Sequence, residues 1–178
     1  MDIDEITRHV SGLDGVLAQR PRHGDPTVPE IAWGDTFFFY APDGELPRAQ
    51  PFATIVTKDY PGDTGSRLRA PERFRLNIAA GAEAFTAHTG HPPRAGIPAP
   101  DPAATDTLFA HPLYAGAGWL AVVNPGPRTA SALPALFTAA HARAKAAHER
   151  RHRPAHSTAE RLDDTETAMT ISPTEPDS

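Results

Sequence analysis

The segment from residue 50 to residue 79 constrains the fold more than any other part of the chain, because it places two strand patterns around a polar loop. Residues 52–57 (FATIVT) are rich in β-branched side chains, and residues 74–78 (FRLNI) alternate strictly between apolar and polar. A period of two is typical of a strand whose successive side chains point to opposite faces of a sheet. The sequence therefore predicts a strand, an ordered loop and a second strand.

The remaining predicted elements are short and are separated by turn residues. Further strands are predicted at residues 15–18, 36–40 and 118–124. Helices are predicted at residues 2–13 and 81–89, and a single helical turn at 105–110. A last helix is predicted to end at about residue 150, with Thr129 or Ser131 as its N-cap. The two terminal helices each carry one apolar stripe. We therefore predict an α+β fold, with an antiparallel sheet of about four or five strands and the N- and C-terminal helices packed on one face.

Composition divides the chain into a domain and a tail. The length of 178 residues suits one domain with an appendage. Residues 1–150 are predicted to form a single globular domain. Residues 151–178 are rich in Pro, Ser, Thr and acidic side chains and hold few apolar ones, so we expect a disordered tail.

Charge and cysteine content exclude several classes of protein. Lys and Arg number 17 against 22 Asp and Glu, and this net charge of −5 makes a nucleic-acid partner unfavourable. The absence of cysteine excludes disulfides, thiolate nucleophiles and cysteine-based metal sites. The N-terminus is acidic where a signal peptide is basic, and no apolar run approaches the roughly 20 residues that span a membrane. We expect a cytoplasmic monomer or homodimer without a membrane partner.

Several blocks of the sequence together resemble an actinobacterial family known only as a domain of unknown function. The blocks are residues 29–38 (PEIAWGDTFF), 51–63 (PFATIVTKDYPGD), 74–78 (FRLNI), 111–114 (HPLY), 118–119 (GW) and 124–126 (NPG). This resemblance covers roughly residues 1 to 148 and implies no activity. A looser likeness is to the MmcQ/YjbR-like α+β proteins, for which nucleic-acid binding has been proposed. A likeness at the level of the fold does not carry a function with it.

Arg75 and Asn77 are the first candidate site residues, because alternation sends both to the face opposite the apolar residues of the same strand. One interpretation is a sheet face that binds an anionic or carbonyl-bearing small ligand. The other is an open antiparallel sheet whose polar face lies in water.

The loop after the strand predicted at residues 52–57 supplies further candidates: Lys58, Asp59 and Asp63, with Tyr60 in the same predicted ligand loop. If the two strands are neighbours, Lys58 and Arg75 lie about 5 Å apart in one cationic patch, which either Asp59 and Asp63 or a bound anion would offset. Two alternatives are that the two aspartates share a hard cation, and that they belong to an ordinary turn that Asp59 caps. We predict no metal site, and the sequence identifies no cofactor.

His111 and Trp119 complete the set of candidate ligand-binding residues, as an acid or base and an aromatic wall. The alternative for His111 is a partly buried ring that the backbone satisfies. Residues 148–152 (HERRH) match the zinc motif H-E-x-x-H, but the two arginines and the following proline favour a solvated basic helix end.

Three function hypotheses follow. The first is a small-ligand-binding module without catalysis. The second is a hydrolase or transferase that uses Asp59, Asp63 and His111. The third is a nucleic-acid-binding accessory protein, which the acidic composition disfavours.

Overall fold

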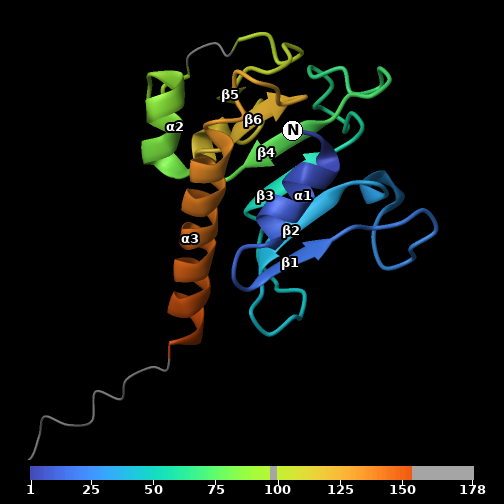
Figure 1. Ribbon diagram of the computed structural model, residues 1–178, viewed down its shortest axis with the longest axis vertical. Coiled ribbons are helices and arrows are strands. Elements are labelled where there is room, and N and C mark those ends of the chain that lie inside the picture. The colour runs from blue at the N-terminus through green and yellow to red at the C-terminus, as the bar shows by residue number, and fades with distance from the viewer. Residues whose placement is uncertain (97–99, 154–178) are drawn as a thin grey trace, which may run out of the picture.

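A computed structural model describes residues 1–96 and 100–153 of the chain. It contains one antiparallel sheet of six strands, with three α-helices and two short 3-10 helices (Figure 1). In chain order the elements are α1 (Ile3–Ser11), β1 (Val16–Gln19), η1 (Glu30–Ala32), β2 (Thr36–Tyr40), β3 (Ala53–Val56), β4 (Arg75–Ile78), α2 (Gly81–Thr89), β5 (Phe109–Ala110), η2 (Ala115–Ala117), β6 (Leu120–Val123) and α3 (Leu133–His152). The class is therefore α+β, as the sequence predicts.

The sheet has the strand order β1-β2-β3-β4-β6-β5, and every neighbouring pair is antiparallel. Strands β1 to β4 form a meander. The chain then leaves the sheet through α2 and returns as β5 and β6, with β6 beside β4 (Figure 1). The central pair is β3 and β4, in which Thr54 lies opposite Asn77 and Val56 opposite Arg75.

One face of the sheet forms the main hydrophobic core with all three helices. Alternate residues of β3, β4 and β6, such as Ile55, Leu76 and Val122, are buried in one cluster. The same cluster contains Ile6 and Val10 from α1, Phe85 from α2, and Leu133, Leu136, Phe137 and Ala140 from α3. This apolar burial is the main term that stabilises the fold.

The opposite face of the sheet is covered by loops. A second, smaller cluster holds Val56 from β3, Ala121 and Val123 from β6, and Phe109 from β5, with Leu68 from the long loop between β3 and β4. This face also carries Arg75 and Asn77 from β4. Each of the two is only 3% exposed, so the interpretation of a solvated polar face is wrong.

Two local predictions need correction. Residues 109–110 form the short strand β5 and not part of a helical turn, which accounts for the sixth strand. Two residues are too few to show a period, and β5 forms because it pairs with β6. Helix α3 begins after Ala132 without a side-chain cap, since Thr129 instead donates to Asp106 at 2.6 Å.

The predicted tail begins within α3, which extends to His152, and residues 154–178 lie outside the described part of the chain.

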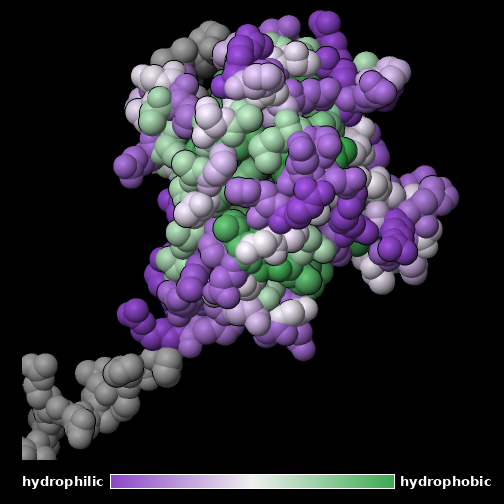
Figure 2. Space-filling model, in the orientation of Figure 1, coloured by the Kyte–Doolittle hydropathy of each residue, from purple (hydrophilic) through white to green (hydrophobic). Residues whose placement is uncertain are grey.

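On the side of the molecule that α1 and α3 cover, hydrophobic surface gathers in the middle of the view between these two helices, with hydrophilic residues around it (Figure 2). Within residues 1–96 and 100–153, no helix has both the length and the apolar character to cross a membrane.

Candidate functional site

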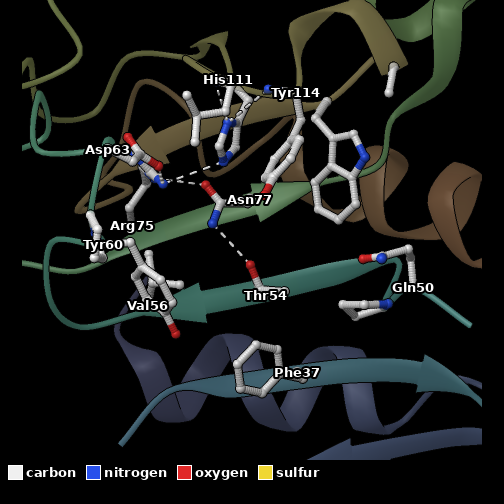
Figure 3. A pocket seen from close by; sticks show the side chains of 15 residues that line it. Phe37, Gln50, Thr54, Val56, Tyr60, Asp63, Arg75, Asn77, His111 and Tyr114 are labelled. Carbon is white, nitrogen blue, oxygen red and sulfur yellow. Dashed lines mark hydrogen bonds and ion pairs between the residues drawn. The ribbon is translucent and has the colours of Figure 1, made fainter. Parts of the chain in front are cut away.

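A cavity of about 520 Å³ lies on the loop-covered face of the sheet (Figure 3). This volume is within the range that binds small organic ligands. Its sheet floor comes from three adjacent strands and is formed by Phe37, Thr54, Val56, Arg75 and Asn77. Its walls come from three loop segments and are formed by Gln50, Pro51, Tyr60, Pro61, Asp63, His111, Leu113, Tyr114, Ala117 and Trp119.

A tight turn brings Asp63 into this cavity. The backbone N–H of Asp63 donates to the carbonyl of Tyr60 at 2.9 Å, and Gly62 has a φ of 78°. Pro61 followed by a glycine with positive φ is the arrangement of a type II turn. The turn folds the loop back over β4, so that Asp63 reaches Arg75.

Arg75 and Asp63 form a buried, bidentate ion pair. Nη1 of Arg75 donates to Oδ1 of Asp63 at 2.9 Å, and Nη2 donates to Oδ2. Both side chains are almost completely buried. Burial by itself raises the pKa of Asp63, but the hydrogen bonds and positive charge of Arg75 outweigh it and hold that pKa below its usual value. The charge of Arg75 is thus offset within the protein.

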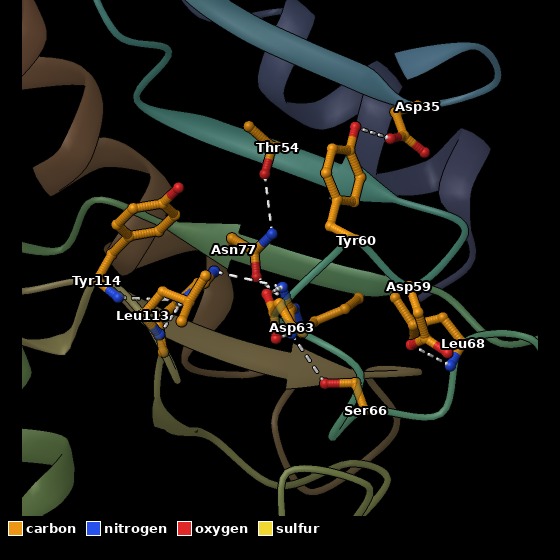
Figure 4. Close-up of polar contacts among 12 residues, drawn as sticks. Asp35, Thr54, Asp59, Tyr60, Asp63, Ser66, Leu68, Asn77, Leu113 and Tyr114 are labelled. Carbon is orange, nitrogen blue, oxygen red and sulfur yellow. Dashed lines mark hydrogen bonds and ion pairs between the residues drawn. The ribbon is translucent and has the colours of Figure 1, made fainter. Parts of the chain in front are cut away.

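A polar row continues from this pair across the sheet. Nε of Arg75 donates to Oδ1 of Asn77 at 2.8 Å, and Nη1 donates to Oγ of Ser66 at 3.0 Å. Nδ2 of Asn77 in turn donates to Oγ1 of Thr54 on β3 at 2.9 Å (Figure 4). The antiparallel register places Phe37, Thr54 and Asn77 opposite one another on three strands, so the row ends against an aromatic ring.

His111 follows β5 directly and is held by the backbone. Its Nδ1 accepts hydrogen bonds from the N–H groups of Leu113 at 3.1 Å and Tyr114 at 3.3 Å. Its Nε2 lies 3.4 Å from Nη2 of Arg75, and the side chain is buried. Burial, followed by the charge of Arg75, lowers the pKa of His111 from 6.5 to about 4, against the opposing effect of Asp63. The ring is therefore neutral at pH 7, and the prediction that the backbone satisfies it is confirmed for Nδ1.

Aromatic rings wall the cavity beside His111. The ring centroids of His111 and Tyr114 are 4.7 Å apart, and those of Tyr114 and Trp119 are 6.1 Å apart. The chain reverses between the two aromatic residues at Gly118, whose φ is 78°. A Cβ atom there would lie 2.9 Å from the carbonyl carbon of Gly81, so this position requires glycine.

Two of the predicted site residues lie elsewhere. The ammonium of Lys58 binds Asp35 and the carbonyls of Ile31 and Trp33, so the predicted cationic patch of Lys58 with Arg75 does not form. Asp59 accepts a hydrogen bond from the N–H of Leu68 at 2.9 Å and does not line the cavity. The structure thus brings together Asp63, Arg75, Asn77, His111 and Trp119, and separates Lys58 and Asp59 from them.

The H-E-x-x-H segment forms the last turns of α3. The rings of His148 and His152 stack with their centroids 4.0 Å apart, and Nδ1 of His152 lies 2.8 Å from the carbonyl of His148. No group of three or more His, Asp or Glu side chains that could hold a metal ion occurs within residues 1–96 and 100–153.

Sequence reasoning missed several residues of the site: Phe37, Thr54, Ser66 and Tyr114. Thr54 could have been found from the alternation of residues 52–57, once β3 was paired with β4. Tyr114 stands three residues after His111 in the HPLY block. Ser66 carries no local signal, because only the folding of the loop brings it to Arg75.

Comparison with known proteins identifies the family of the chain but no activity. A family model described as a family of unknown function (DUF6194) matches residues 1–153. This match does not bear on the looser MmcQ/YjbR likeness. No curated protein and no solved structure matches the chain.

Proposed function

Because the chain belongs to a family of unknown function (DUF6194), we propose its function from the cavity alone: it binds a small ligand through an oxygen atom of that ligand. One observation carries the proposal. A cavity of about 520 Å³ has buried polar groups, Arg75 and Asn77 on its floor and His111 beside them in the wall, next to a group of aromatic rings. An apolar cavity with a few convergent polar groups is the usual form of a small-molecule site.

The two parts of the cavity suit two parts of a ligand. The buried polar groups would orient an oxygen-bearing group of the ligand, because Arg75 is fixed by its ion pair and His111 by the backbone. The rings of Trp119 and Tyr114 would contact an apolar or aromatic body, which gains free energy by leaving water.

The geometry supports binding better than catalysis. The hydrolase or transferase hypothesis requires Asp59, Asp63 and His111 to act together. Asp59 instead accepts a hydrogen bond from the N–H of Leu68, and both carboxylate oxygens of Asp63 accept from Arg75, whose charge lowers the pKa of Asp63 and makes it a weaker base. Neither carboxylate is placed to act as a general base, which needs a free oxygen within reach of a substrate proton.

A thermal-shift screen of small metabolites, nucleotides and metal ions tests the proposal. A ligand at 100 times its Kd stabilises the folded state by about 2.7 kcal/mol, which raises the Tm by roughly 5–10 °C for a chain of this size. The exposed Ala117 lines the cavity, so Ala117→Trp should fill its mouth and abolish the response while the free protein stays folded.

The matched control is Ala87→Trp, the same substitution on the exposed side of α2. This variant should respond to the ligand as the unmodified protein does. A response that persists in Ala117→Trp, or a broad screen in which nothing raises the Tm, would contradict the proposal.

A further inference from the structure

Arg75 and His111 each direct a hydrogen-bond donor at the other. A guanidinium has five N–H donors. Four of those in Arg75 have oxygen acceptors, on Asn77, Ser66 and the two carboxylate oxygens of Asp63. The fifth donor is on Nη2. In the described part of the chain it faces Nε2 of His111, at a distance of 3.4 Å.

His111 cannot accept that donor. Its Nδ1 already accepts from two backbone N–H groups, so Nδ1 carries no proton. In a neutral imidazole the proton is then on Nε2, which makes Nε2 a donor. Two N–H groups therefore face each other where the floor of the cavity meets its wall, on Arg75 and His111, which are only 3% and 2% exposed.

The fifth donor of Arg75 and Nε2 of His111 both lack an acceptor among the described residues, and a buried donor without an acceptor is destabilising. One acceptor atom within hydrogen-bonding distance of both nitrogens would satisfy the two donors. An oxygen with two lone pairs meets that need in a single atom. On the premise of the ligand-binding function above, we propose that the cavity takes a ligand with a neutral carbonyl oxygen, such as an amide or a ketone, held by Nη2 of Arg75 and Nε2 of His111.

The charges around the donor pair favour a neutral ligand group over an anion. Asp63 already offsets the charge of Arg75 through two hydrogen bonds, and His111 is uncharged. A carboxylate would add a second negative charge beside Asp63 without a second cation. A buried charge without a partner is strongly unfavourable, whereas a carbonyl dipole requires no counter-charge.

Titration of the protein with benzamide and with benzoate tests this selectivity, because the two probes share a ring and differ in charge. The indole N–H signal of Trp119 in an NMR spectrum reports on the cavity. Trp33 is the one other tryptophan and does not line the cavity, so its signal is an internal control. Benzamide should bind at least about tenfold more tightly than benzoate at pH 7.5.

Two variants separate the roles of charge and of the donor. Asp63→Asn removes the internal offset, so benzoate should then bind at least as tightly as benzamide. His111→Asn keeps a side-chain oxygen that can accept from the N–H of Leu113 but lacks the Nε2 donor, and it should weaken benzamide about tenfold. His88→Asn, on the exposed side of α2, should change neither affinity.

The outcomes distinguish the two proposals. If benzoate binds the unmodified protein as tightly as benzamide, the preference for a neutral carbonyl is overturned and the ligand site still stands. If benzamide binds equally well to His111→Asn, the assigned donor pair is overturned. If neither probe moves the Trp119 signal and the thermal-shift screen also finds nothing, the ligand-binding function itself fails.

Discussion

Two buried aspartates, Asp35 and Asp63, each pair with a cation, but the two clusters differ in how fully the cation is satisfied. The ammonium of Lys58 donates to Asp35 at 3.1 Å, to the carbonyl of Ile31 at 3.1 Å and to that of Trp33. An ammonium has three donors, so Lys58 is saturated. The guanidinium of Arg75 has one donor left, and it points at another donor.

The carboxylates show the same contrast. Asp35 also accepts from the N–H of Thr57 at 2.8 Å, from its hydroxyl at 2.9 Å, and from the hydroxyl of Tyr60 at 2.6 Å. Burial, and then the contact with Asp35, raise the pKa of Tyr60 and keep it protonated as a donor. A saturated cluster of this kind fixes loops to the sheet. An unsaturated one at a cavity has a place for a ligand, and this difference distinguishes a structural ion pair from a candidate site.

The largest expected effect comes from breaking the Arg75 cluster. Arg75→Met leaves the carboxylate of Asp63 buried without a partner, and we expect the free energy of unfolding to fall by about 3–5 kcal/mol. Urea denaturation measures this change. The double variant Arg75→Met/Asp63→Leu should recover most of the loss, since it removes the unpaired charge. A single variant within about 1 kcal/mol of the unmodified protein would show that the pair is not effectively buried.

An intermediate effect should appear in the pH dependence of stability. His111 has a pKa of about 4 in the folded state and 6.5 as the ordinary value, so the unfolded chain binds a proton between these values that the folded chain does not. The free energy of unfolding should therefore fall as the pH drops from about 6.5 to about 4, by at most about 3 kcal/mol. Asp63 has a lowered pKa, so the stability that its charged form contributes is lost only at more acid pH, below the ordinary pKa of aspartate.

The variant His111→Asn isolates this contribution. Urea denaturation of both proteins at several pH values should show a shallower slope for the variant between pH 6.5 and 4.5. Equal slopes would mean that His111 is as easily protonated in the folded protein as in the unfolded chain, and that the ring is not held beside Arg75.

The smallest effect is expected in the saturated cluster. Asp35→Asn keeps one acceptor oxygen but removes the charge that faces Lys58 and Tyr60, and we expect a loss of about 2 kcal/mol in the free energy of unfolding. Lys58 is 33% exposed, so water can solvate part of its charge. The affinity for benzamide, measured by the Trp119 signal, should not change. A weaker affinity would show that the Asp35 cluster is part of the site.

Much of the fold could be predicted from local patterns. The alternation in residues 74–78 predicts β4 and the common face of Arg75 and Asn77, because a period of two is a property of the extended backbone itself. The positions of β1, β2, β3 and β6 follow from similarly local signals. Strand β5 could not be found in this way, since its two residues are ordered by pairing with β6.

The candidate site was predictable only in part. The sequence identified Asp63, Arg75, Asn77, His111 and Trp119 as polar or aromatic groups near the predicted strands. The prediction that Lys58 lies beside Arg75 was wrong. It assumed that the alternation of β3 continues as far as Lys58, whereas β3 ends at Val56 and the Lys58 side chain binds Asp35.

Local sequence is enough to predict which residues can lie on which face of the sheet, because backbone alternation and side-chain polarity are local properties. Tertiary structure alone decided which charges meet. Asp63 reaches Arg75 across 12 positions through a proline–glycine turn, and His111 arrives from 36 positions away after the chain has left and re-entered the sheet. The tautomer of His111 likewise depends on backbone donors placed by the fold. The ion pair of Arg75 with Asp63, its burial, and the two facing donors on Arg75 and His111 all arise from contacts between residues distant in sequence. No local pattern specifies them.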